Sequence, residues 1–221
     1  IKIKRDDIGR RDIFTLEEYD QLVRFLRSYS SVKECPDKFI RDERLMVRDC
    51  ILIASNTMLR VGELWNLEWR DIVSIEKHID EMNKPIHLVT INVRPEISKT
   101  RNSRRVICRG GEYIERLKKN STNTKPDNFL FSAIGGTSKL DRKKWYLHWK
   151  NLMNGIGIEN YSERQLTWYS LRHFGITCRI RAKVPYAYIS KIAGTSVTHI
   201  ETHYGHYDDA MLKSTALKNF Q

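Results

Sequence analysis

Apolar residues first recur at helical spacing after a short polar start. Thr15 precedes the run and Glu18 stands three residues later, which is the sequence pattern of a capping box. The apolar positions that follow are Leu16, Tyr19, Leu22, Val23 and Leu26. Residues three and four apart share one face of a helix, so the segment predicts an amphipathic helix that ends near residues 28–31. A second, more apolar helix is predicted over residues 42–58.

The period of the pattern changes to two between residues 72 and 108. Three short strands are predicted, over residues 72–75, 87–93 and 104–108. Residues 95–103 join the last two strands and read as a hairpin turn. Strands joined by such turns pair in an antiparallel manner, so we expect a small three-stranded antiparallel sheet.

Helical periodicity returns in the rest of the chain. Helices are predicted over residues 112–119, 138–154 and 170–183. Pro185 begins the next helix at its first turn and Gly194 ends it, and two further helices are predicted over residues 197–204 and 208–220. The predicted fold class is therefore α+β and mainly helical, with the sheet at one edge.

The composition adds a strong positive charge. Lys and Arg number 39 against 27 Asp and Glu, which gives a formal net charge of +12 and a pI near 9.6. This excess favours a polyanionic partner, with nucleic acid as the first candidate and a merely basic, solvated surface as the alternative. Residues 1–13 are polar and basic and are interpreted as a linker, or as an arm along a phosphate backbone.

Apolar runs and cysteines exclude several classes of protein. No apolar run approaches the roughly 18 residues that a membrane span requires. The four cysteines form no C-x-x-C pair, so they are interpreted as reduced core residues, and neither a metal site nor a cofactor is predicted. The chain begins at Ile1 without Met or a signal segment, which indicates a fragment of a longer intracellular protein.

Two arginines and a tyrosine form a candidate phosphate site. Arg172 opens a helical segment, and Tyr204 follows about thirty residues later. A guanidinium binds phosphate oxygens through two hydrogen bonds, and a phenolate can attack phosphorus. Arg60 has Glu63 three residues later, close enough to hold the arginine side chain in one orientation. The alternative for this pair is a surface ion pair beside a buried Leu/Trp patch.

The predicted hairpin carries a basic tip. Lys99 lies in the turn, and the candidate DNA-binding residues Arg101, Arg104 and Arg105 follow it. Lysine and arginine at such a tip bind phosphates and base edges in a groove of duplex DNA. A basic turn that serves only solubility is the alternative.

These segments together resemble the catalytic domain of the tyrosine recombinases, also called the phage integrase family. Residues 57–64 resemble the first-arginine box, residues 98–100 the hairpin-lysine box and residues 170–173 the second-arginine box. Residues 193–195, with Tyr204 nine residues after Thr195 (204 − 195 = 9), resemble the last box. The resemblance covers nearly the whole chain. It implies a catalytic domain over residues 14–221 without the family's N-terminal core-binding domain.

The resemblance implies a site-specific DNA recombinase, or integrase, that cleaves and rejoins strands through a 3′-phosphotyrosine. Arg60 and Arg172 would clamp the scissile phosphate, Lys99 would protonate the leaving 5′ oxygen and Tyr204 would attack phosphorus. Two arginines can stabilise the anionic transition state, so no metal is required. The amphipathic segment 208–220 would pack on its own domain, or on a neighbouring protomer in a homotetramer on DNA. Such a protein is expected in the cytoplasm with the nucleoid, or encoded by a virus or mobile element.

Two positions depart from the family pattern. Tyr169 stands where the family usually has His, and Thr195 stands where it usually has His or Trp. We expect both hydroxyls to donate hydrogen bonds to the phosphate, while solvent, the phosphate itself or a nearby histidine takes the phenolic proton. Among the histidines, His173 is the first candidate because it adjoins Arg172, and a surface or capping role is the alternative for each of them. The other candidate bases are His199, His203 and His206, and Tyr207 is the rival nucleophile. A catalytically impaired DNA-binding or regulatory relative and, further away, a type IB topoisomerase remain as alternative functions.

Overall fold

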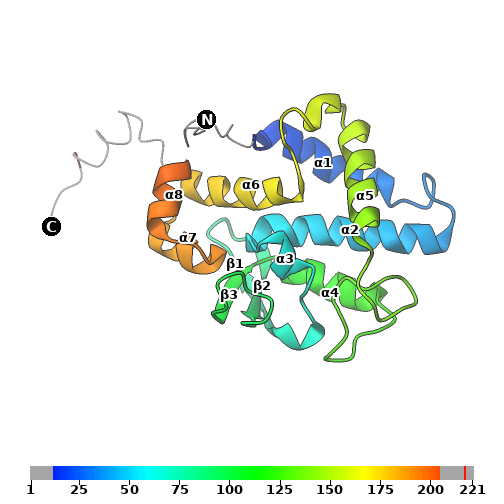
Figure 1. Cartoon of the computed structure of the whole chain (residues 1–221), viewed down its shortest axis with the longest axis horizontal. Coiled ribbons are helices and arrows are strands. Elements are labelled where there is room, and N and C mark those ends of the chain that lie inside the picture. Colours follow the sequence, from blue (N-terminus) through cyan, green and yellow to red (C-terminus); the bar gives the residue numbers. More distant parts are fainter. Residues whose placement is uncertain (1–11, 205–216, 218–221) are drawn as a thin grey trace, which may run out of the picture.

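The computed structural model describes residues 12–204 and 217, and this part of the chain forms eight α-helices and one sheet (Figure 1). The helices are α1 (Leu16–Tyr29), α2 (Lys38–Thr57), α3 (Val61–Leu64), α4 (Gly111–Asn120), α5 (Arg142–Gly155), α6 (Trp168–Arg181), α7 (Tyr186–Ala193) and α8 (Val197–Tyr204). The predicted α+β, mainly helical fold is confirmed. Most of the predicted basic arm, His206, Tyr207 and the predicted helix over 208–220 lie outside the described residues, apart from residue 217.

Side-chain caps decide where the first two helices begin. The Thr15 hydroxyl accepts the backbone N–H of Glu18 (3.1 Å) and the Glu18 carboxylate accepts that of Thr15 (2.9 Å), so the predicted capping box is present. Helix α2 starts at Lys38, earlier than the predicted residue 42, because the Asp37 carboxylate caps the N–H of Ile40 (2.9 Å). The helix ends where Met58 adopts a left-handed φ of 54°.

The sheet consists of β1 (Ile72–Ile79), β2 (Pro85–Val93) and β3 (Arg104–Arg109), antiparallel and in the order β1-β2-β3. Strand β1 runs past the predicted residue 75. Its turn to β2 is made by the Asp80 carboxylate, which accepts the backbone N–H groups of Met82 (3.0 Å) and Lys84 (2.9 Å). Val93 pairs with Arg104, so residues 94–103 form the predicted hairpin connection, here named the Lys99 hairpin.

Helix α5 shows how the core selects one face of a helix. It begins at Arg142 rather than at the predicted residue 138, because the Asp141 carboxylate accepts the N–H of Lys143 (2.6 Å). Trp145 and Trp149 are one turn apart and both buried, and Trp145 and Trp168 lie 5.1 Å apart between ring centroids. These tryptophans join α5 to the start of α6.

Helices α2 and α6 lie side by side and approach closely (Figure 1). Gly175 of α6 makes this approach possible, because a Cβ at this position would stand 2.2 Å from the Ser55 carbonyl oxygen of α2. Helix α6 therefore carries Arg172 to the end of α2, where Arg60 follows. Helices α7 and α8 continue from the end of α6 and lie at one side of the molecule (Figure 1).

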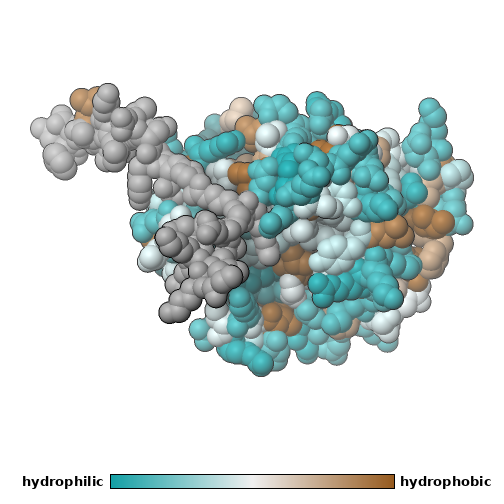
Figure 2. Space-filling view, turned by 45° about the horizontal axis from the view of Figure 1, so that its top comes forward, coloured by the Kyte–Doolittle hydropathy of each residue, from teal (hydrophilic) through white to brown (hydrophobic). Residues whose placement is uncertain are grey.

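The described residues on the face shown in Figure 2 are mostly hydrophilic, with separate hydrophobic patches. None of the helices in the described part of the chain is long and apolar enough to cross a membrane. The four cysteines are free thiols; Cys35, Cys50 and Cys108 are buried and Cys178 is half-buried. The interpretation of the cysteines as reduced core residues agrees with this placement.

Candidate active site

Arg60 is held by hydrogen bonds at both ends of its guanidinium. The residue has an extended backbone (φ −65°, ψ 145°) and directly precedes helix α3. Its Nη1 donates to Glu63 Oε1 (3.0 Å), its Nη2 donates to the Gly194 carbonyl (2.6 Å), and its backbone N–H donates to Glu63 Oε2 (3.0 Å). The ion pair expected from the spacing of Arg60 and Glu63 is therefore present, and it fixes the arginine.

Glu63 also binds a second arginine, Arg104 of β3. The Glu63 side chain is 1% exposed, and both of its oxygens accept hydrogen bonds from Arg104, from Nη1 at 3.0 Å and from Nη2 at 2.6 Å. Burial alone would raise the pKa of Glu63, but the hydrogen bonds and charge of Arg104, followed by those of Arg60, hold this pKa below its ordinary value. Glu63 therefore remains an anion that orients two cations.

Arg172 is the second candidate clamp residue, and it is 3% exposed. Its Nη1 donates to two backbone carbonyls, that of Met58 at 2.6 Å and that of Ala193 at 2.7 Å. Burial lowers the pKa of Arg172, but an arginine remains charged at neutral pH. Within residues 12–204, no carboxylate forms an ion pair with Arg172. A buried cation surrounded by neutral carbonyls is suited to an anionic ligand.

The two arginines converge on one turn of the chain. Arg172 donates to the carbonyl of Ala193 and Arg60 donates to the next carbonyl, that of Gly194. Gly194 makes this turn with a left-handed φ of 63° at the end of α7, where the sequence predicted a helix end. We name Arg60, Arg172 and these two carbonyls the arginine clamp.

Tyr204, the candidate nucleophile, lies at the end of α8 and contacts His173 of α6, the helix that carries Arg172. Its hydroxyl forms a hydrogen bond with His173 Nδ1, and the two ring centroids are 5.5 Å apart. Burial raises the pKa of Tyr204 well above its ordinary value, and the positive charge of Arg172 opposes this rise. The structure thus brings Arg60, Arg172, His173 and Tyr204 together.

The two positions that depart from the family pattern border the same group. The Tyr169 ring stands edge-on to His173, 4.8 Å between centroids, and the Arg172 guanidinium lies 5.9 Å from the Tyr169 ring centre. Thr195 follows the Gly194 turn, and its backbone N–H donates to the Ser190 carbonyl (3.1 Å). Both residues therefore lie beside the clamp in the folded chain.

The Lys99 hairpin is exposed and separate from these contacts. Lys99 and Arg101 lie on its surface, and the Ser98 and Thr100 hydroxyls form a hydrogen bond within the turn (3.1 Å). Arg105, on the adjoining strand β3, is exposed as well. Between residues 12 and 204, no hydrogen bond or ion pair joins Lys99 to Arg60, Arg172 or Tyr204. Arg104, grouped with these basic residues from sequence, instead points to Glu63.

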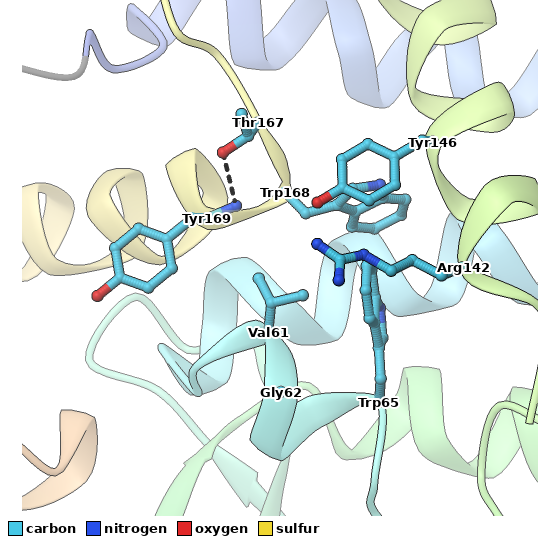
Figure 3. A pocket seen from close by; sticks show the side chains of 8 residues that line it. All are labelled: Val61, Gly62, Trp65, Arg142, Tyr146, Thr167, Trp168 and Tyr169. Carbon is cyan, nitrogen blue, oxygen red and sulfur yellow. Dashed lines mark hydrogen bonds between the residues drawn. The ribbon is translucent and has the colours of Figure 1, made fainter. Parts of the chain in front are cut away.

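Sequence reasoning missed a cavity beside the clamp. Its volume is about 410 Å³, and neither clamp arginine lines it (Figure 3). The lining residues are Val61, Gly62, Trp65, Arg142, Tyr146, Thr167, Trp168 and Tyr169. Arg142 and Tyr146 project into it from α5, with the Arg142 guanidinium 5.5 Å from the Tyr146 ring centre. One signal in the sequence could have indicated it. Helix α5 begins with Arg142, Lys143 and Lys144, although the helix dipole disfavours cations at the first turn.

His199 is a further titratable group near the clamp. It lies in the first turn of α8, 4.2 Å from His203 between ring centroids. Burial, followed by the charges of His203, Arg172 and Arg60, holds the pKa of His199 below its ordinary value. In the described part of the chain, no group of three or more His, Cys, Asp and Glu residues could hold a metal ion.

Comparison with known proteins connects this geometry to one family. The model of the phage integrase family matches residues 13–211. The fold is similar to that of XerH site-specific recombinase bound to difH substrate in a pre-cleavage complex, with TM-score 0.64, 16% identity, and coverage of 98% of this chain and 56% of that chain. It is also similar to the Tn1549 transposon integrase in complex with circular intermediate DNA (TM-score 0.62, 17% identity, 97% and 67% covered) and to XerA recombinase (0.59, 18%, 97% and 68%).

At these identities the likeness to solved structures shows the fold alone. The chain spans about half the length of the XerH chains, 53% and 56% in two complexes. A comparison with curated proteins gives no match. The family model covers nearly all of the chain, and solved tyrosine recombinases share its fold, so this chain belongs to the phage integrase family of tyrosine recombinases.

Proposed function

We propose that this chain is the catalytic domain of a site-specific DNA recombinase that cuts and rejoins strands through a 3′-phosphotyrosine on Tyr204. One observation carries the proposal. Arg60 and Arg172 are anchored to consecutive carbonyls, and Tyr204 lies close enough to interact with the Arg172 charge. Two fixed cations beside a tyrosine are the groups that a phosphodiester transfer needs.

Double-stranded DNA is the proposed partner. The net charge of +12 favours a polyanion, and the basic side chains of Arg101 on the Lys99 hairpin and of Arg105 on β3 are exposed. The XerH and Tn1549 integrase structures are both DNA complexes. Assembly of a homotetramer through residues 208–220 and an origin in a virus or mobile element remain predictions.

The clamp would act by stabilising charge. A phosphodiester is anionic, and charge on its non-bridging oxygens grows as a fifth oxygen approaches phosphorus. The guanidinium of Arg60 is fixed by Glu63 and the Gly194 carbonyl, and that of Arg172 by the carbonyls of Met58 and Ala193. Because these donors are already oriented, little reorganisation is needed when the charge develops. Tyr169 and Thr195 are proposed to donate further hydrogen bonds to the same phosphate.

Lys99 would supply a proton to the leaving 5′ oxygen. An alkoxide is a poor leaving group, and a positioned acid contributes typically about 10²–10⁴-fold to such a step. The exposure of Lys99 and its place on a hairpin suit a group that reaches its position when DNA binds. The phosphotyrosine then conserves the energy of the broken bond, so the ends can be rejoined without ATP.

Covalent capture of DNA tests the proposal. The probe is a pool of duplexes with randomised sequence, each carrying one 5′-bridging phosphorothiolate. Its sulfur leaves as a thiolate without protonation and rejoins poorly, so a protein–DNA adduct accumulates. We expect an adduct on the native chain that peptide mass analysis places on Tyr204 and that Tyr204→Phe abolishes. Tyr188→Phe, at an exposed tyrosine of α7, is the matched control.

A second function is favoured by two departures from the family pattern: Tyr169 replaces the usual His, and Thr195 replaces the usual His or Trp. In that case the chain is a relative of the recombinases that binds DNA in a regulatory role and has impaired catalytic activity. Retention of duplexes from the pool without any adduct would support this reading and contradict the recombinase. An adduct on Tyr207 instead of Tyr204 would contradict the assignment of the nucleophile.

A further inference from the structure

We propose that His173 is the base that accepts the phenolic proton of Tyr204 when the tyrosine attacks phosphorus. The inference rests on the proposed function and adds a catalytic residue to it. A phenol is a weak nucleophile, and burial makes Tyr204 even less acidic than usual. An acceptor in direct contact with the hydroxyl is therefore required.

The geometry points to His173. Its Nδ1 forms a hydrogen bond with the Tyr204 hydroxyl, with the two rings tilted by 38°. His173 directly follows Arg172 on α6, so one helix holds a phosphate-binding group and the acceptor next to each other. The nucleophile thus contacts a base that is fixed relative to the clamp, which is the arrangement that activates hydroxyl nucleophiles in general.

Tyr169 explains why the acceptor can stand at residue 173. Residues 169 and 173 are four apart on α6, so they lie on the same face, one turn from each other. A neutral tyrosine at 169 is not a base at neutral pH, but its ring packs edge-on against the imidazole at 4.8 Å between centroids and limits the rotation of that ring.

The proton and electron balance is complete. His173 enters neutral, with its proton on Nε2 and a lone pair on Nδ1. As the bond from Tyr204 Oη to phosphorus forms, the phenolic proton moves to Nδ1, and the bond from phosphorus to the 5′ oxygen breaks. Lys99 protonates that oxygen, or the leaving sulfur departs as a thiolate in the phosphorothiolate probe. During rejoining, the 5′ hydroxyl gives its proton back to Lys99 as it attacks phosphorus. The bond from phosphorus to Tyr204 Oη breaks, and His173 returns the proton to that oxygen.

The charges around His173 determine the expected pH dependence. Arg172 and Tyr169 lie on the same helix, Tyr204 faces it from α8, and Arg60 reaches the adjoining clamp from the start of α3. An imidazole can accept a proton only in its neutral form. The rate of adduct formation should therefore rise with pH as His173 loses its proton.

The experiment measures single-turnover adduct formation with the phosphorothiolate pool, which removes any need for Lys99. His173→Asn keeps a polar group near the position of Nδ1 but cannot take up a proton. We expect its rate to fall by about 10²–10⁴-fold and its pH-dependent rise to disappear. His173→Ala should be rescued by added imidazole, with rates that increase with the basicity of substituted imidazoles. A residue that only supports the structure would not give such rescue.

The controls separate the two proposals. His78→Gln, at an exposed histidine of β1, should match the native chain in rate and pH profile. DNA retention and thermal unfolding of each variant establish that it is folded. An adduct on the native chain with an unchanged rate and pH profile in His173→Asn would overturn the role of His173 and leave the proposed function standing. No adduct on the native chain would contradict the proposed function itself.

Discussion

The arginine clamp and the Lys99 hairpin carry the same charge but are built in opposite ways. Arg172 is 3% exposed and Arg60 is tied to Glu63, and both donate to backbone carbonyls. Lys99 lies on the surface of a connection between two strands. In residues 12–204, hydrogen bonds and ion pairs fix the clamp cations and leave this lysine unattached.

The difference corresponds to two kinds of chemistry. Groups that stabilise charge work best when their donors are oriented in advance, because reorganisation then costs little. A general acid needs to reach its oxygen only while that oxygen departs, and an exposed lysine can be placed by the DNA itself. The clamp should therefore be intolerant of small changes in geometry, whereas the effect of Lys99 should depend on the leaving group.

The largest effect is expected for Arg172→Lys. Lysine keeps the charge, but its ammonium group does not have the planar, fixed arrangement of donors of a guanidinium. It therefore cannot hold the two carbonyls and a phosphate in the geometry that Arg172 provides. We expect adduct formation on the phosphorothiolate pool to slow by about 10³-fold. Arg181→Lys, at an exposed arginine of the same helix, is the control and should react like the native chain. If Arg172→Lys reacted at the native rate, the clamp would not depend on the geometry of its donors, and the proposed difference from the Lys99 hairpin would be wrong.

Lys99→Ala should give an intermediate effect that depends on the substrate. Duplexes that react are recovered from the pool, and the same sequences are synthesised with an ordinary phosphodiester and a nick. On these, adduct formation should fall by about 10²-fold, because the alkoxide leaves without an acid. On the phosphorothiolate versions, the rate should stay near that of the native chain. Lys77→Ala, at an exposed lysine of β1, is the control. Equal losses on both links would indicate that Lys99 binds DNA instead of acting as an acid.

Local patterns predicted much of the fold and the candidate site. Thr15 with Glu18, the Lys99 hairpin and the helix end at Gly194 each depend on neighbours a few residues away, and all three are present. The Arg60–Glu63 pair is of the same kind. His173 was the first of four candidate histidines because it adjoins Arg172, and its role as a base stays a prediction.

Contacts between distant residues could not be predicted. The carbonyls of Met58 and Ala193 anchor Arg172, but backbone oxygens have no residue-type signature. The start of α2 was placed too late because Asp37 lies outside the apolar pattern that marked the helix. Arg104 and Arg105 look equivalent in sequence, yet alternation along β3 sends only the first toward Glu63, 41 residues earlier in the chain.

The smallest effect on the rate of adduct formation is expected for Arg104 and Arg105, where the comparison between fixed and exposed cations applies to two neighbouring residues. Arg104→Gln removes one of the two cations on Glu63 and should slow adduct formation by about tenfold, because Arg60 loses part of its support. Arg105→Gln should leave the rate on bound DNA unchanged but reduce the slope of DNA affinity against salt by about 1. Filter binding at several salt concentrations, beside the adduct assay, separates the two effects.

Stability at low pH gives an independent test of the Arg104–Glu63 contact. The pKa of Glu63 is lowered in the folded chain, so its stabilising contribution is present above the unfolded value of about 4.3 and is lost as pH falls through the lower folded value. Arg104→Gln should raise the folded pKa toward the ordinary value. The variant should therefore be less stable than the native chain in urea at pH 7, and this difference should shrink in acid. A difference that stays constant with pH would mean that Arg104 stabilises the fold by packing alone, and that the charge of Glu63 does not depend on it.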